Sequence, residues 1–332
     1  MRLNNIHNKA FKSDSQRLAF SLRSSIAKRR SHLNAALCVI QKFRNNMRVN
    51  YEEKTFESYF NNELDSRTSV YFPFGQVQEG SIGADSAAFS KNRRLWWRLG
   101  HPFIFSLPFE GVEFSEMAGI MEKYMGHEIK NLPNIKTNIL FQYKKPEYIA
   151  SHLGGEWKHW SQPYYRYDIY QKQQLMLEEL SQTLKGKALI LYASPAINDV
   201  DELVKTKQLR KIIKSTNFRP AEELKGHHKN TYIKSGLYSI ACSEPEKLES
   251  FDLLEHLARL DTNTENTEEQ LHEFVKNVVS VIMKTELNRA FVALYEPFVE
   301  RNIKQYPILN SVLQLKLVRD ITGLQWCIAF DA

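Results

Sequence analysis

The middle of the chain has the sequence pattern of a strand, a helix and a second strand, and this order limits the fold classes that the chain can adopt. Residues 138–144 are mostly apolar, residues 170–184 carry leucines among their helical apolar positions, and Gly186 follows as a helix stop. Residues 188–193 are wholly apolar, as parallel strands buried on both faces are. The order predicts a βαβ unit with a right-handed crossover and therefore an α/β fold.

Three regions of different character surround this unit. Residues 1–50 are expected to form a basic helical arm, residues 51–245 the core with an insertion at 91–136, and residues 246–332 a mostly helical C-terminal region with an apolar end. Ser194-Pro195 is expected to break the second strand. The periodicity predicts further helices at 14–48, 52–64, 114–124, 201–215, 253–260, 271–295 and 309–321, and strands at 70–74, 76–79, 84–89, 164–167, 232–233 and 238–241.

The positive charge of the chain lies in its first 50 residues. They contain eleven Lys or Arg against Asp14 alone, whereas the rest holds 34 basic and 37 acidic residues, so the whole net charge of +7 comes from this arm. A basic arm suits a polyanion such as DNA, and Lys28, Arg29 and Arg30 are its candidate phosphate contacts. A solvated basic helix and an organelle transit peptide are the alternatives.

Several protein classes are not indicated by the sequence. No apolar run is long enough to cross a bilayer, and the N-terminus lacks the apolar core of a secretory signal. Three widely separated cysteines indicate a reducing compartment rather than a disulfide or zinc framework. We therefore expect a cytoplasmic protein that does not bind membranes. Without a Gly-Lys-Ser/Thr phosphate loop, ATP use by this chain is not expected.

Two segments of the core carry residues suited to metal-dependent hydrolysis. Asp85 follows a glycine-containing turn, with Glu79 a few residues before it, and Gln142-Tyr143-Lys144 ends an apolar strand. Residues two apart on a strand share a face, so Gln142 and Lys144 are expected to project together. A carboxylate and a second oxygen can hold a divalent ion, while a lysine stabilises developing negative charge.

These residues resemble the PD-(D/E)xK, or restriction-endonuclease-like, superfamily, in the Gln-x-Lys form seen in Mrr-like restriction enzymes and bacterial anti-phage nuclease effectors. The resemblance covers about the middle third of the chain and implies a mixed sheet flanked by helices. It assigns catalysis to Asp85, Gln142, Lys144 and Glu79, and binding of Mg²⁺ or Mn²⁺ to Asp85, Gln142 and either Glu57 or Glu63 on a preceding helix.

The chain departs from the family pattern in two ways. Gln142 lies 57 positions after Asp85, where the family has a short hairpin, so an insertion at 91–136 is required. A neutral Gln142 also brings no charge to a metal, so activity would depend more on Asp85 and on a glutamate of the preceding helix. An inactive member that keeps the fold is the alternative, because fold likeness alone does not establish the chemistry.

Arginines beside aromatic residues are the remaining candidates for DNA contacts. Arg93 and Arg94 precede Trp96-Trp97, and Arg166 stands between tyrosines on a predicted strand. Arg pairs with phosphate and an indole can stack on a base, although packing of both tryptophans over the sheet is the alternative. Gln173 and Gln174, on the helix after the Lys strand, are expected to face solvent, with a place in the active site as the alternative.

The resulting expectation is a magnesium-dependent DNA endonuclease of bacterial restriction or anti-phage defence, acting as a homo-oligomer or with a companion defence protein. The main alternative is a catalytically inactive subunit that binds nucleic acid or a partner. A regulatory protein whose basic arm binds an acidic partner is a third hypothesis.

Overall fold

The computed structural model describes residues 47–67, 70–71, 114–130, 135–261 and 266–330. The chain divides after Met47 into two compact units, and nearly all described residues belong to the unit that begins at Arg48. The basic arm with Lys28, Arg29 and Arg30, the hairpin with Glu79 and Asp85, and the segment with Arg93 and Arg94 lie outside the described residues. No helix in the described ranges has the length and apolar composition needed to span a bilayer.

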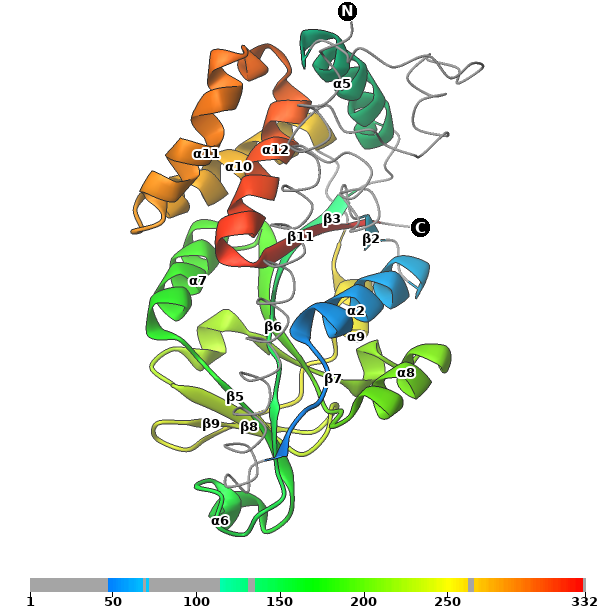
Figure 1. Ribbon diagram of the computed structural model, residues 1–332, viewed down its shortest axis with the longest axis vertical. Helices are drawn as coiled ribbons and strands as arrows, with labels where there is room; N and C mark the ends of the chain where they lie inside the picture. Colours follow the sequence, from blue (N-terminus) through cyan, green and yellow to red (C-terminus); the bar gives the residue numbers. More distant parts are fainter. Residues whose placement is uncertain (1–46, 68–69, 72–113, 131–134, 262–265, 331–332) are drawn as a thin grey trace, which may run out of the picture. The chain divides into compact units, whose positions relative to one another are not determined.

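A mixed sheet forms the centre of the described unit (Figure 1). Its order is β2–β11–β3–β6–β7, in which only the β3–β6 pair is parallel. Helix α7 (Gln171–Thr183) lies between β3 and β6 in the chain, so the predicted strand–helix–parallel-strand order is confirmed. The strands are β2 (Val70–Tyr71), β3 (Ile135–Tyr143), β6 (Ala188–Pro195), β7 (Thr216–Pro220) and β11 (Leu324–Phe330).

A second sheet has the order β1–β4–β5–β8–β9–β10, and its pairs from β4 to β10 are antiparallel. Buried hydroxyl groups connect the two sheets: the Tyr232 Oη donates to Ser194 Oγ at 2.8 Å, and Ser194 Oγ donates to the carbonyl of Lys144 at 3.0 Å. The strands are β1 (Met47–Arg48), β4 (Glu147–Ile149), β5 (Tyr164–Asp168), β8 (Lys229–Tyr232), β9 (Ser239–Cys242) and β10 (Glu246–Leu248).

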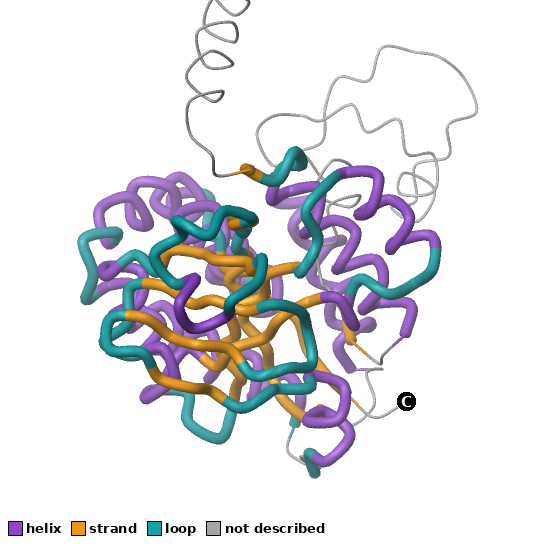
Figure 2. The backbone as a smooth tube through the Cα atoms, turned by 90° about the horizontal axis from the view of Figure 1, so that it is seen from below, coloured by secondary structure: helices purple, strands orange, loops and turns teal. Residues whose placement is uncertain are grey.

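Helices cover both faces of the mixed sheet (Figure 2). On one face, Phe56 and Phe60 of α2 (Glu53–Arg67) pack against Phe141 and Tyr143 of β3, together with α8 (Val200–Gln208) and α9 (Leu253–Arg259). The other face packs against α7 and against α5 (Phe114–Lys130), α10 (Thr267–Met283), α11 (Asn288–Glu300) and α12 (Pro307–Thr322). The protein is therefore of mixed α/β class, with a continuous apolar layer on each side of β3.

Four local predictions from the sequence are wrong. Strand β6 continues through Ser194-Pro195 because both residues still pair with β7. The helix expected at 201–215 ends at Gln208, and a 3₁₀ turn at Ile213–Ser215 leads into β7, which the periodicity did not predict. The helix expected at 271–295 is two helices, α10 and α11. The apolar end of the C-terminal region is strand β11 of the mixed sheet, lying between β2 and β3.

A candidate active site at the end of strand β3

The alternation of side chains along β3 sorts its residues between the two faces of the sheet. Phe141 and Tyr143 face α2 and pack in its aromatic cluster. Leu140 belongs to the core on the other face, so Gln142 and Lys144 point away from α2 and toward α7. Both are buried although polar, with 6% and 7% of their surfaces exposed. Burial of such groups is costly without partners, and those partners come from α7.

Gln173 of α7 joins Gln142 to Lys144. The Lys144 Nζ donates to Gln173 Oε1 at 2.7 Å, and the Gln173 Nε2 donates to Gln142 Oε1 at 2.8 Å. The Gln142 Nε2 donates to the carbonyl of Tyr143 at 3.2 Å. The expectation that Gln173 and Gln174 face solvent is wrong, because Gln174 is also buried and donates to the carbonyl of Ala221.

Lys144 lies between two tyrosine rings. Its Nζ is 4.7 Å from the centre of the Tyr170 ring and 5.6 Å from that of Tyr192. Burial lowers the pKa of Lys144 to about 8, and the charges of Glu53 and Asp168 oppose this effect. No carboxylate of the described residues lies within ion-pair distance of its Nζ. Lys144 is therefore a buried amine with electron-rich neighbours and a hydrogen bond, but with no countercharge in contact from the part of the chain that the structure describes.

Two carboxylates near Lys144 were not among the residues selected from the sequence. Glu53 begins α2 and accepts a hydrogen bond from the backbone N–H of Lys145 at 3.0 Å. Burial raises the pKa of Glu53, while that hydrogen bond and the charge of Lys144 lower it in part. Asp168 ends strand β5. Neither residue stands in a motif with Gln142, and only the packing of α2 and β5 brings them close enough to act on Lys144.

The two candidate metal ligands on α2 are bonded elsewhere. Glu57 is buried and forms ion pairs with Lys54 at 2.9 Å and with Arg319 at 2.8 Å. Glu63 accepts hydrogen bonds from the backbone N–H groups of Ile212 and Ile213 at 2.7 and 3.4 Å. Their helix covers the face of β3 opposite to Gln142 and Lys144, so the structure does not bring them to that pair.

The donor atoms near Lys144 match a hard divalent cation in part. Gln142 Oε1 is a carbonyl oxygen, and Glu53 and Asp168 are carboxylates, which are the groups that Mg²⁺ prefers. Among the described residues, however, no three His, Cys, Asp or Glu side chains form a group that could hold a metal ion. Asp85 and Glu79, the other carboxylates selected from the sequence, lie outside the described residues.

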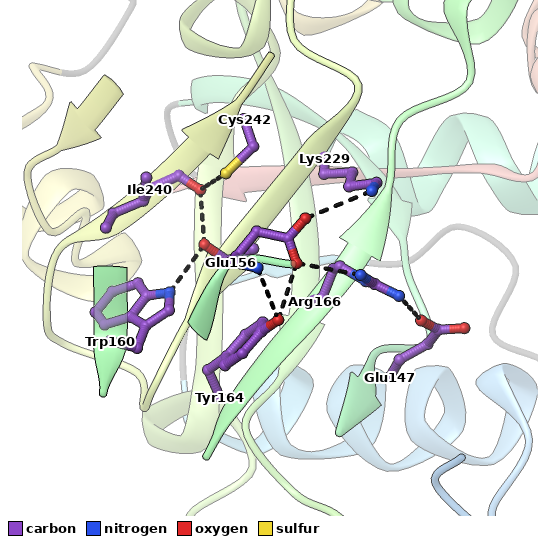
Figure 3. Close-up of polar contacts among 9 residues, drawn as sticks. Glu147, Glu156, Trp160, Tyr164, Arg166, Lys229, Ile240 and Cys242 are labelled. Carbon is purple, nitrogen blue, oxygen red and sulfur yellow. Dashed lines mark hydrogen bonds and ion pairs between the residues drawn. The ribbon is translucent and has the colours of Figure 1, made fainter. Parts of the chain in front are cut away.

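Arg166 belongs to a separate ion-pair network on the second sheet (Figure 3). It donates to Glu147 at 2.6 Å and to Glu156 at 3.1 Å. Glu156 also accepts from Tyr164 at 2.9 Å and pairs with Lys229 at 3.4 Å. We call these five residues the Arg166 network.

The charges of the Arg166 network stabilise one another. Burial alone would lower the pKa of Arg166, but Glu147 and Glu156 raise it. Burial alone would raise the pKa of Glu156, but the hydrogen bond from Tyr164 and the charges of Arg166 and Lys229 lower it. Arg166, proposed from the sequence as a phosphate contact, thus already has two carboxylates in contact.

No protein-family model, curated protein or solved structure matched this chain. The assignment of a function therefore depends on the site itself.

Proposed function

We propose that the protein is a metal-dependent nuclease of the Gln-x-Lys, PD-(D/E)xK kind, which hydrolyses phosphodiester bonds in DNA. The observation that carries the proposal is the arrangement at the end of β3: a buried Lys144, without a carboxylate in contact among the described residues, is joined through Gln173 to Gln142. A buried cation that is not neutralised is suited to an anionic substrate or transition state.

The side chains have distinct roles in this proposal. Lys144 donates to the phosphate oxygen on which negative charge develops, and the low polarity around it strengthens that interaction. Gln142 offers its carbonyl oxygen to the cation, with Asp85 as the carboxylate that the resemblance supplies. Gln173 orients both side chains. A bound Mg²⁺ or Mn²⁺ would activate water and neutralise phosphate charge.

The topology around β3 supports the same proposal. The resemblance implies a mixed sheet in which the Lys strand runs parallel to the strand reached through a crossover helix, and β3, α7 and β6 have this relation. Strand β11 is an addition from the C-terminal region on the other side of β3. We propose that β11 and the insertion at 91–136 are both additions to the core that the resemblance implies.

A catalytically inactive subunit that binds nucleic acid or a companion defence protein is the second candidate. It is favoured by the neutral Gln142 and by the other engagements of Glu57 and Glu63. In such a subunit Lys144 and Gln173 would serve only to hold α7 against β3.

Digestion of plasmid and linear DNA with Mg²⁺ or Mn²⁺ separates these candidates. Wild type is compared with Lys144→Ala and with Lys172→Ala, whose lysine pairs with Glu286 on the surface. We expect metal-dependent cutting that falls at least about 100-fold in Lys144→Ala and is unchanged in Lys172→Ala. Cutting at the wild-type rate by Lys144→Ala would reject the proposed site, and DNA binding without cutting by wild type would favour the inactive subunit.

A further inference from the structure

The segment after β6 has an unusual charge. Between Glu202 and Glu222 there is no acidic residue, although the chain after residue 50 carries more acidic than basic residues. Five basic side chains of this segment are exposed. They are Lys205 and Lys207 on α8, Arg210 and Lys211 in the following turn, and Lys214 in the 3₁₀ turn, and we call them the α8 basic patch.

The α8 basic patch is distinguished by its density: five exposed cations lie within ten residues, with no acidic residue among them. Lys172, Lys247 and Lys284 each lie within 4 Å of a glutamate. None of the five patch residues has an ion pair with any described residue. The Lys207 Nζ instead lies 4.0 Å from the centre of the Tyr59 ring on α2. The helix macrodipole accounts for positive charge in the last turn of α8, but not for Lys211 and Lys214 beyond it.

The turn that carries the α8 basic patch is held in place by α2. Glu63 accepts hydrogen bonds from the N–H groups of Ile212 and Ile213, the two residues between Lys211 and Lys214. Both isoleucines are buried against α2. Arg210 has a φ of 51°, a left-handed conformation that Gly or Asn usually adopts at a helix end. These contacts hold the backbone of the turn between Lys211 and Lys214 against α2.

The α8 basic patch is connected to the candidate active site through β6. The Lys144 N–H donates to the carbonyl of Ala193 at 3.0 Å, and Ser194 Oγ donates to the carbonyl of Lys144. Helix α8 begins five residues after the end of β6, and it packs beside α2 (Figure 1). The patch and Lys144 therefore follow the same end of the parallel strand pair but lie toward opposite faces of the sheet, because α8 packs with α2 and Lys144 faces α7.

We propose that the α8 basic patch binds the phosphate backbone of a nucleic acid strand. This inference goes beyond the proposed function and does not depend on it, because phosphate binding does not require cleavage. Exposed Lys and Arg side chains without countercharges release condensed cations from DNA on binding, and this makes the contact sensitive to salt and indifferent to sequence.

Salt-dependent DNA binding tests the proposal. The full chain with Lys205→Gln, Lys207→Gln and Lys211→Gln is compared with a control carrying Lys172→Gln, Lys247→Gln and Lys284→Gln. Binding to a fluorescently labelled DNA duplex is followed by anisotropy at several KCl concentrations in EDTA, which prevents metal-dependent cutting. Because all six lysines are exposed, both triple variants are expected to keep the wild-type urea midpoint.

We expect the patch variant to bind more weakly and to lose a slope of about 0.9 in log Kd against log [KCl] for each phosphate contact removed. The control variant should keep the wild-type slope. An unchanged affinity and slope in the patch variant would overturn the proposal and leave an acidic protein as the partner of this face. Since Lys144→Ala retains the patch, its binding without cutting separates this inference from the proposed function.

Discussion

The protein contains two largely buried cations, one on the second sheet and one at the end of a strand of the mixed sheet, and their surroundings are opposite. Arg166 on β5 has two carboxylates in contact, whereas Lys144 after β3 has an amide oxygen and two aromatic faces. The first arrangement compensates charge, and in the second no described residue compensates it in a poorly solvated position. The first arrangement is the more stable of the two, and uncompensated buried charges of the second kind are found at functional sites.

The comparison also separates two residues that the sequence analysis selected for contact with DNA phosphate or for chemistry on it. Both are basic residues beside a tyrosine in or at the end of a predicted strand. Only the structure shows that Glu147 and Glu156 come to Arg166, while Glu53 and Asp168 stay outside contact distance of Lys144. We therefore expect substitutions at Arg166 to act on stability and substitutions at Lys144 to act on chemistry.

The largest effect is expected for Arg166→Met. Its removal takes the Arg166 partner from Glu147 and one of two paired cations from Glu156 in a half-buried position, and we expect a loss of about 2 kcal/mol in the free energy of unfolding. Urea denaturation measures this loss. Arg259→Met, which breaks an exposed pair with Glu255, is the control and should cost no more than about 0.5 kcal/mol. Equal losses in the two variants would contradict the stabilising role assigned to the ion pairs of Arg166.

The pH dependence of cutting is the next largest effect. With a Lys144 pKa of about 8, the charged form is lost as the pH rises, so kcat should fall up to tenfold per pH unit above that value. Lys144→Arg stays charged throughout and should keep whatever activity it has without this fall. Measuring kcat between pH 6.5 and 9.5 decides the role, since a rate that rises through pH 8 would make Lys144 a base.

A smaller and opposite effect on stability is expected for Lys144→Met. The pKa of Lys144 is lower in the folded chain than its ordinary value of 10.5, so its charge opposes folding at pH 7. The methionine variant should be more stable than wild type by about 1 kcal/mol, after the lost hydrogen bond is allowed for.

The pH dependence of that advantage is the check. The unfolded chain keeps the Lys144 proton up to about pH 10.5, whereas the folded chain loses it near pH 8. Wild-type stability therefore rises relative to Lys144→Met across this window, and unfolding in urea at pH 7, 8.5 and 10 follows it. A constant difference between the two proteins would show that Lys144 is not buried as a charge.

The smallest effect concerns metal affinity in Gln142→Glu. A carboxylate at this position adds a charged oxygen ligand while still accepting from Gln173. We expect the Mg²⁺ concentration that gives half-maximal cutting to fall about threefold to fivefold. Titration of MgCl₂ in the plasmid assay measures this, with Gln325→Glu on β11 as a control for charge in the same sheet. An increased requirement would place Gln142 away from the metal.

The sequence predicted the part of the fold that local pattern controls. The wholly apolar run at 188–193 and the helix before it were enough for the parallel pair of β3 and β6. Strand β11 was not predicted as part of the sheet because its partner β3 lies far away in sequence. Strand β7 was not predicted because the basic segment before it has the pattern of a helix. Pairing between distant segments leaves no local trace.

In the candidate site, too, the sequence predicted only what local spacing determines. The two-residue spacing of Gln142 and Lys144 predicted a shared face of β3, and both side chains bond to Gln173 there. The roles of Glu57 and Glu63 depended on which side of the sheet α2 covers, and no residue pattern in α2 itself shows this. The position of Gln173 in the first turn of the crossover helix could have indicated a place in the site. A solvent-exposed pair of glutamines, however, has the same sequence pattern.

The position of β11 has a consequence for how the protein is made. Gln142 of β3 pairs with Leu324, so this side of β3 stays open while about 180 further residues are synthesised. An unpaired apolar strand edge is a template for wrong pairing, and closing so long a loop slows folding. The nascent chain should therefore be most prone to aggregation after β6 has formed and before β11 is synthesised.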